Sequence, residues 1–156
     1  MDPHSKEVAY GLAAYAFCFP FLFGGIWCAV CCLLAFGGGW QALARSYRAA
    51  GDFRGGTRDS ESGSLGGVNY RWALSCGASA DGLYLEINGL FRPGHPPLLI
   101  PWKDVHAERT KSWFGSNRVE FWFDAAKNAR LSVSPDLGGY LLSAAPVELR
   151  NAATHS

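Results

Sequence analysis

The chain has 156 residues, of which 49% are hydrophobic, and its 14 Lys and Arg against 13 Asp and Glu leave a formal net charge of +1. A charge this close to balance creates no strong positive field, so nucleic acid is not expected as a partner. Four of the five cysteines lie in one apolar run near the amino terminus, and only Cys76 lies outside it. A disulfide framework in the rest of the chain is therefore excluded, and a reducing compartment is the simpler interpretation.

The apolar run is the dominant feature of the sequence. No charged residue occurs from Val8 to Ala44, and residues 9–36 are almost wholly apolar. A membrane-spanning helix needs about 20 apolar residues, because the hydrocarbon core of a bilayer is about 30 Å thick. A cleavable signal peptide is not expected, since the start, MDPHSKEV, is not net basic and the run is too long. The sequence predicts a short polar tail at 1–8, then one uncleaved span with a juxtamembrane helical extension, together 9–50.

Basic residues flank this run unevenly, and the imbalance predicts the orientation of the span. One precedes the run, Lys6, and four follow it: Arg45, Arg48, Arg54 and Arg58. Cytoplasmic flanks carry the excess of Lys and Arg, so we expect a single-pass protein of the inner (plasma) membrane whose carboxyl-terminal domain is cytoplasmic. Trp40 and Tyr47 stand where aromatic residues of the membrane interface are expected.

Cys28, Cys31 and Cys32 form a cluster inside the span. Metal ligation, thiol–disulfide chemistry and acylation all use cysteines, but no His, Asp or Glu within the span completes a metal shell. Cysteine also packs as a small apolar residue at helix contacts, which is the simpler interpretation. Formation of a homo-oligomer through the span is left open.

Residues 51–68, which are rich in Gly, Ser and charge, predict a flexible linker. From residue 69 onward, short apolar runs separated by turn signals predict antiparallel strands. In residues 70–76 the alternation places Tyr70, Trp72, Leu74 and Cys76 on one face. Asp81-Gly82 is a strong hairpin signal before the next strand. The remaining strands are predicted at 83–87, 98–100, 104–112, 119–123 and 129–133.

A helix is predicted at 136–145, with Pro135 at its start and an apolar face of Leu137, Leu141 and Leu142. The fold class is therefore α+β: one amino-terminal transmembrane helix, then a small antiparallel β-sheet or barrel capped by a carboxyl-terminal helix. The domain is expected to occupy residues 69–146, with a tail at 147–156.

Two short motifs of this domain resemble a known family. The segment Asp81-Gly82-Leu83-Tyr84-Leu85 and the segment Ile100-Pro101-Trp102-Lys103-Asp104-Val105 are similar to bacterial pleckstrin-homology-like (PH-like) domains. Their setting after a span looks like that of uncharacterised bacterial single-pass membrane proteins. The resemblance implies a scaffold for binding or assembly and carries over no catalytic residue. From the residues themselves, Ile100 and Val105 are expected in the core, with Trp102 covering the sheet edge.

No catalytic, cofactor-binding or metal site is predicted. The nearest approach is the row Asp104, His106 and Glu108, which alternate along one strand and are more typical of a solvated polar face. The sequence contains no GxSxG, Walker or HExxH motif. We therefore expect no enzyme and no cofactor.

Two segments are candidates for recognition. The loop with Phe91, Arg92 and His95 is stiffened by prolines, and it is either a plain connection or a docking loop for a membrane or cytoplasmic protein. The hairpin tip at 109–118 groups cations with two aromatic residues and is a candidate membrane or ligand contact, unless its aromatic side chains fold into the core. Its residues are Arg109, Lys111, Trp113, Phe114 and Arg118.

The function predicted from the sequence is a non-enzymatic, membrane-anchored interaction or assembly module with a cytoplasmic PH-like domain. The alternative is a sensor domain at the membrane that binds a lipid or a small molecule. A protein partner would favour the loop at 91–97, whereas a lipid ligand would favour the hairpin tip.

Overall fold

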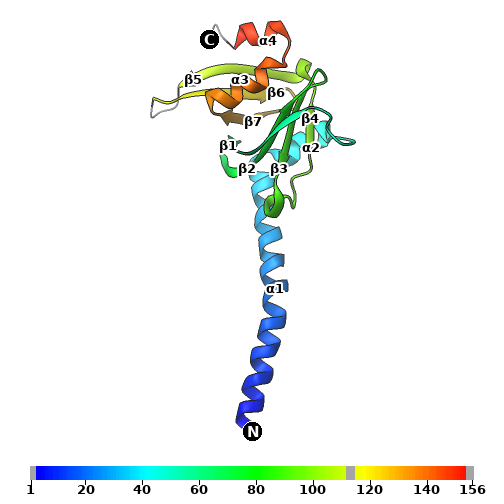
Figure 1. Cartoon of the computed structure of the whole chain (residues 1–156), viewed down its shortest axis with the longest axis vertical. Helices are drawn as coiled ribbons and strands as arrows, with labels where there is room; N and C mark the ends of the chain where they lie inside the picture. Colours follow the sequence, from blue (N-terminus) through cyan, green and yellow to red (C-terminus); the bar gives the residue numbers. More distant parts are fainter. Residues whose placement is uncertain (1–2, 112–114, 154–156) are drawn as a thin grey trace.

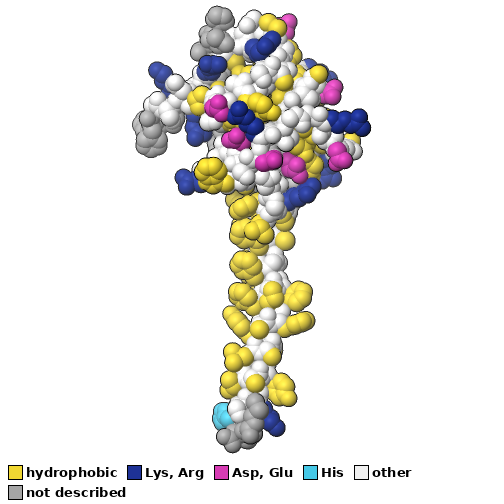
Figure 2. Space-filling model, in the orientation of Figure 1, with side chains coloured by type: hydrophobic (Ala, Val, Ile, Leu, Met, Phe, Trp, Pro, Cys, Tyr) yellow, Lys and Arg dark blue, Asp and Glu magenta, His cyan; other side chains and the backbone are white. Residues whose placement is uncertain are grey.

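The computed structural model describes residues 3–111 and 115–153. Helix α1 (Pro3–Gly37) projects from a β domain as a separate rod (Figure 1). Among the described residues it is the one helix long and apolar enough to cross a membrane. Its large apolar side chains are exposed along most of its length (Figure 2), whereas apolar side chains of a soluble domain pack in a core.

Helix α2 (Trp40–Tyr47) does not continue α1, so the expected juxtamembrane extension is wrong in this respect. The break lies at Gly38 and Gly39, and Gly39 has a φ of 77°, which favours glycine. A Cβ on Gly39 would lie 2.8 Å from the Cβ of Ala129, so the chain turns in close contact with the sheet. The turn directs one face of α2 into the core, where Trp40, Leu43, Ala44 and Tyr47 are buried.

The domain contains one seven-stranded antiparallel sheet in the order β4-β3-β2-β1-β7-β6-β5. The α+β prediction is confirmed. The strands are β1 (Gly56–Leu65), β2 (Val68–Ala78), β3 (Leu83–Ile87), β4 (Leu98–Ile100), β5 (Val105–Lys111), β6 (Asn117–Phe123) and β7 (Ala126–Val133). Short 3₁₀ turns, η1 (Gly89–Phe91) and η2 (Trp102–Asp104), lie on either side of β4.

Strand β1 occupies most of the segment 51–68, so a flexible linker over that whole segment is wrong. It pairs with β2 along its length and with β7 at its carboxyl end, where Leu65 lies opposite Leu131. The pairing with β2 is interrupted by register shifts between Arg58 and Gly63, and such irregularities bend a strand and increase its twist. Strand β1 thereby joins the β4-β3-β2 part of the sheet to the β7-β6-β5 part.

Strand β2 departs from simple alternation. Tyr70, Leu74 and Cys76 are buried as expected, but Trp72 is 75% exposed and has a φ of 55°. The bulge turns Trp72 outward and Ala73 inward, so the prediction for Trp72 is wrong. The Asp81-Gly82 turn does connect antiparallel strands, β2 and β3, as predicted.

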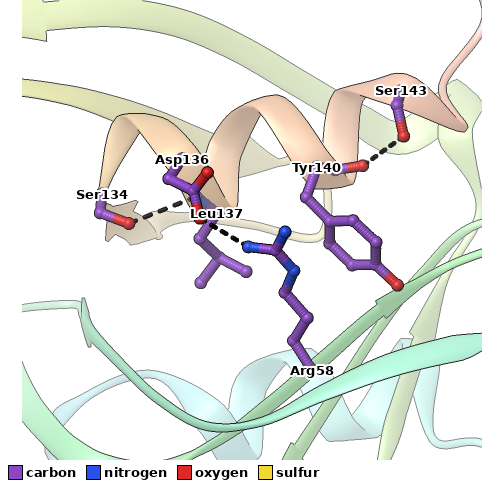
Figure 3. Close-up of polar contacts among 6 residues, drawn as sticks. All are labelled: Arg58, Ser134, Asp136, Leu137, Tyr140 and Ser143. Carbon is purple, nitrogen blue, oxygen red and sulfur yellow. Dashed lines mark hydrogen bonds and ion pairs between the residues drawn. The ribbon is translucent and has the colours of Figure 1, made fainter.

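Helix α3 (Pro135–Ser143) confirms the predicted helix, and Leu137, Leu141 and Leu142 are buried. Ser134 caps its first turn by accepting a hydrogen bond from the Leu137 N–H at 3.3 Å. Figure 3 shows Arg58 of β1 reaching this helix, where it pairs with Asp136 at 2.6 Å and lies over the Tyr140 ring at 4.5 Å. A further short helix, α4 (Val147–Ala152), occupies part of the expected tail.

The second family-like motif has the structural roles that the sequence predicted. Ile100 and Val105 are buried in the core. Trp102 of η2 is buried, and its indole N–H donates to the Ser79 carbonyl at 2.7 Å, which links η2 to the β2–β3 turn.

Candidate functional site

A set of specific polar and aromatic contacts lies where α1 meets the domain. The junction loop, residues 88–97, leaves β3, forms η1 and runs along the carboxyl-terminal part of α1. The Trp27 indole N–H donates to the Leu90 carbonyl at 2.7 Å, and the Trp27 and Phe91 ring centroids are 5.3 Å apart. The Cys31 thiol lies 3.8 Å from the same carbonyl. The domain is thus attached to α1 by side-chain contacts as well as by the chain.

The second half of the junction loop lies against α2. The Trp40 indole N–H donates to the Pro96 carbonyl at 2.9 Å, and the Gln41 amide donates to the Gly94 carbonyl. Gly94 also packs on α1, where a Cβ would lie 3.1 Å from the Cα of Cys32. Residues 90 and 94 therefore contact α1, and residues 94 and 96 contact α2, so the loop is held at several points.

A buried polar pair lies behind the loop. The Tyr70 hydroxyl is 3.0 Å from Nε2 of His95, and Nδ1 of His95 is 3.1 Å from the Pro93 carbonyl. Because a carbonyl only accepts, Nδ1 carries the proton and Nε2 accepts from Tyr70. Burial lowers the pKa of His95 and raises the pKa of Tyr70 to about 12. The pair is therefore a neutral hydrogen-bonded unit that packs beside Trp40.

The expected docking loop is only partly available to a partner. His95 is 1% exposed, so it serves the junction and offers no contact surface. Phe91 is half-buried against Trp27. Arg92 is exposed and lies 3.4 Å from Glu86. The residue that sequence reasoning missed is Leu90, whose side chain is 76% exposed although its carbonyl is held by α1.

The cysteine cluster does not converge on one site. Cys31 is buried against the junction loop, Cys32 is half-buried beside Gly94, and Cys28 is exposed. No group of three or more potential metal ligands occurs among the described residues. The packing of Cys31 agrees with its interpretation as a small residue at a contact.

The hairpin tip is described only in part, since Trp113 and Phe114 lie outside the described residues. Arg109 and Lys111 are on β5, and Arg118 on β6 lies within 3.2 Å of the Ser132 hydroxyl. Figure 1 shows β5 and β6 running across the direction of α1.

The polar row of β5 has a local structural role. Nε2 of His106 is 2.9 Å from the Asp124 carboxylate, and its ring stacks on Trp122 with centroids 5.5 Å apart. The contacts link β5 to β6 at a solvent-exposed face.

Two hollows are candidates for a small ligand. A cleft of about 440 Å³ lies between residues 49–55 and the β2–β3 turn, with Phe53 stacked on Tyr84 at 4.4 Å on one wall. A smaller cavity of about 200 Å³ lies at the junction, where Leu34 of α1 faces Tyr70, Phe91 and His95. The second is mainly apolar and lies beside α1.

Comparisons with protein-family models, with curated proteins and with solved structures find no match.

Proposed function

We propose that the chain is a non-enzymatic, membrane-anchored interaction or assembly module, with α1 as its single span and the β domain as its cytoplasmic, PH-like part. The observation that carries this proposal is an apolar helix of 35 residues with its large side chains exposed. Burial of apolar surface stabilises a side chain by about 25 cal/mol per Å², so such a helix is stable in a bilayer and not in water.

The orientation rests on the flanking charges. Arg45 and Arg48 follow α1 and are exposed, while Lys6 is the one Lys or Arg that precedes the run. Basic residues remain on the cytoplasmic side during insertion, which favours a cytoplasmic domain. The PH-like assignment rests on the two motifs and agrees with an antiparallel sheet covered by a carboxyl-terminal helix.

The non-enzymatic part of the proposal rests on the roles of the titratable side chains. His95 is used by the junction, His106 by Asp124, and Arg58 by Asp136. Each of these groups is already held by a structural contact on a different part of the domain. An interaction module needs no such group to be free, whereas an enzyme needs several that converge.

The alternative function, a sensor for a lipid or small molecule, is favoured by the cleft beside Phe53 and Tyr84. Its volume lies within the range typical of small-molecule sites. Charged residues, among them Asp52 and Asp81, line it together with the aromatic pair. A ligand there would contact the segment that connects α2 to β1.

In-membrane photocrosslinking distinguishes the two functions. A photoreactive residue at Trp72 or Arg92, both exposed, is expected to give a discrete protein adduct in the full chain, either to a second copy or to another protein. The same residue at exposed Leu22 of α1 reports self-association of the span. A chain that yields adducts only with small molecules at position 53, and none with protein elsewhere, contradicts the module and supports the sensor.

A further inference from the structure

The carboxyl-terminal part of α1 has two different sides. One side, with Cys31 and Ala35, is buried by the junction loop and the domain. The other side still exposes Leu33 and Phe36, which are 70% and 63% exposed. The apolar exposure of α1 therefore continues to Phe36, nine residues beyond Trp27. On the proposed membrane topology, the exposed side must be covered by lipid up to the level of Phe36.

This level can be compared with the depth of the junction loop. The apolar stretch from Val8 to Phe36 has 29 residues, which gives a helix about 43 Å long at 1.5 Å per residue. A bilayer is about 40–45 Å thick with its headgroups and about 30 Å without them, so each headgroup layer takes about 6 Å. The length of the stretch thus matches the full thickness of the bilayer. Phe36 then lies near the boundary between the cytoplasmic headgroup layer and water.

Leu90 lies well inside that boundary. Its carbonyl contacts Trp27 and Cys31, which precede Phe36 by nine and five residues, or roughly 7–14 Å along the helix. A tilt of about 20°, typical of membrane helices, changes this depth by less than about 1 Å. Leu90 is therefore at or below the edge of the hydrocarbon core. Figure 1 shows the same arrangement, with the green loop beside α1 on the helix side of the sheet.

We propose that the η1 turn of the junction loop enters the bilayer beside α1 and inserts the Leu90 side chain among the lipids, so that the domain is seated on the membrane at a fixed orientation. This inference rests on the proposed function, because it requires α1 to be the span. The exposed Leu90 side chain contacts lipid, since the neighbouring surface of α1 is the lipid-facing surface of the span.

The backbone of the loop is suited to a site from which water is excluded. In hydrocarbon, each unpaired N–H or carbonyl costs several kcal/mol. Here the Asn88 carbonyl accepts from Phe91, the Gly89 carbonyl from Arg92, and the Arg92 carbonyl from His95, at distances of 2.9–3.3 Å. The Leu90 carbonyl accepts from Trp27. The first three bonds are the ordinary i to i+3 bonds of a 3₁₀-type turn, and the fourth, from Trp27, gives the Leu90 carbonyl a partner that a bilayer does not remove.

The side chains around Leu90 fit the same placement. Phe91 and Trp27 are aromatic residues of the kind that concentrate at membrane interfaces. Arg92 is exposed two residues after Leu90, and its long side chain can keep its charge at the level of the headgroups while Leu90 is inserted.

Depth-dependent fluorescence quenching tests the inference in the full chain. The five cysteines are replaced by alanine, and one cysteine is introduced at a time as Leu90→Cys, Leu22→Cys or Val147→Cys. Each is labelled with an environment-sensitive fluorophore and reconstituted in phosphatidylglycerol–phosphatidylcholine vesicles that contain nitroxide-labelled lipid. Leu22 is exposed on α1, and Val147 is exposed on α4 at the far end of the domain, so they serve as the membrane and solvent references.

We expect the probe at position 90 to be quenched by the lipid nitroxide at least several-fold more than the probe at 147, and to be protected from aqueous iodide. Quenching at 22 with a probe at 90 that behaves like the one at 147 overturns the inserted loop and leaves the span in place. Absence of lipid quenching at 22 overturns the span and, with it, the inference. The three introduced cysteines replace exposed side chains. The shared cysteine-free background also replaces the buried Cys31 and Cys76, so its circular dichroism and urea midpoint are first matched to those of the natural chain.

Discussion

The position of Trp40 in the sequence predicts a place at the membrane interface, whereas the structure places it in the core of the domain. The structure buries its side chain completely, beside Tyr70 and His95, with the indole N–H bonded to the Pro96 carbonyl. We predict that Trp40→Ala strongly destabilises the domain. Trp72→Ala is the matched control, since Trp72 is also in the β-domain region but is mostly exposed.

The magnitude follows from the buried area. A buried Trp side chain removes about 200 Å² from water, which at about 25 cal/mol per Å² corresponds to about 5 kcal/mol. Alanine retains about 1 kcal/mol of this, and the Pro96 carbonyl left without its donor adds about 1 kcal/mol to the loss. The expected loss in the free energy of unfolding is therefore about 4–5 kcal/mol, close to that of other core Trp→Ala changes.

Urea unfolding of the full chain in detergent, followed by the circular dichroism of the sheet, measures this loss. With a denaturant slope of about 2 kcal/mol per M, the midpoint should fall by about 2 M for Trp40→Ala. Trp72→Ala should change the free energy by no more than about 0.5 kcal/mol. Equal, small shifts for the two variants would refute the placement of Trp40 in the core.

Three further predictions concern the domain. Burial holds the pKa of His95 below its ordinary value, so below about pH 6.5 the unfolded state binds more protons than the folded state. The free energy of unfolding should therefore decrease as the pH falls below about 6.5. His95→Gln should reduce this pH dependence when urea midpoints are compared between pH 8 and pH 5. Leu141→Ala should lower the free energy of unfolding by about 2–5 kcal/mol and Leu90→Ala by less than about 0.5 kcal/mol in detergent, because the first leucine is buried and the second exposed; equal losses would contradict their burial. A fragment of residues 69–156 lacks α2 and β1 and should show no cooperative unfolding by circular dichroism. A fragment of residues 38–156 contains both elements and should unfold cooperatively. Cooperative unfolding of the shorter fragment would show that α2 and β1 are dispensable.

The features that were predictable from the sequence are those with a local signal. A pattern within one short segment is enough to predict the apolar run, the Asp81-Gly82 turn and the leucines of α3. Strand β1 has no such local pattern, since residues 56–65 contain one large apolar residue, Leu65. These residues form a strand because β2 and β7 pair with them. Its glycines and serines are typical of a linker until those partners are known.

The junction was not predictable for a related reason. The contact between Trp27 and Leu90 joins residues 63 positions apart, and no pattern within either segment reports it. Similarly, glycines are tolerated in membrane helices, so Gly38 and Gly39 did not mark the end of α1 until their contacts with the sheet were known. The burial of His95 has no signal in its own loop, because its partner Tyr70 lies on β2, 25 residues earlier in the chain.

The most direct test of the account is the side of the membrane on which each end of the chain lies. Two single-cysteine variants, His4→Cys and Val147→Cys, are made in a cysteine-free chain. Each is treated with a membrane-impermeant maleimide, first in cells whose outer membrane is permeabilised and whose inner membrane is intact, and then after lysis. The account predicts labelling at position 4 before lysis and at position 147 only after it, because α1 crosses the bilayer and the β domain is cytoplasmic. Labelling of both positions before lysis, of neither until lysis, or of 147 alone before lysis would contradict it.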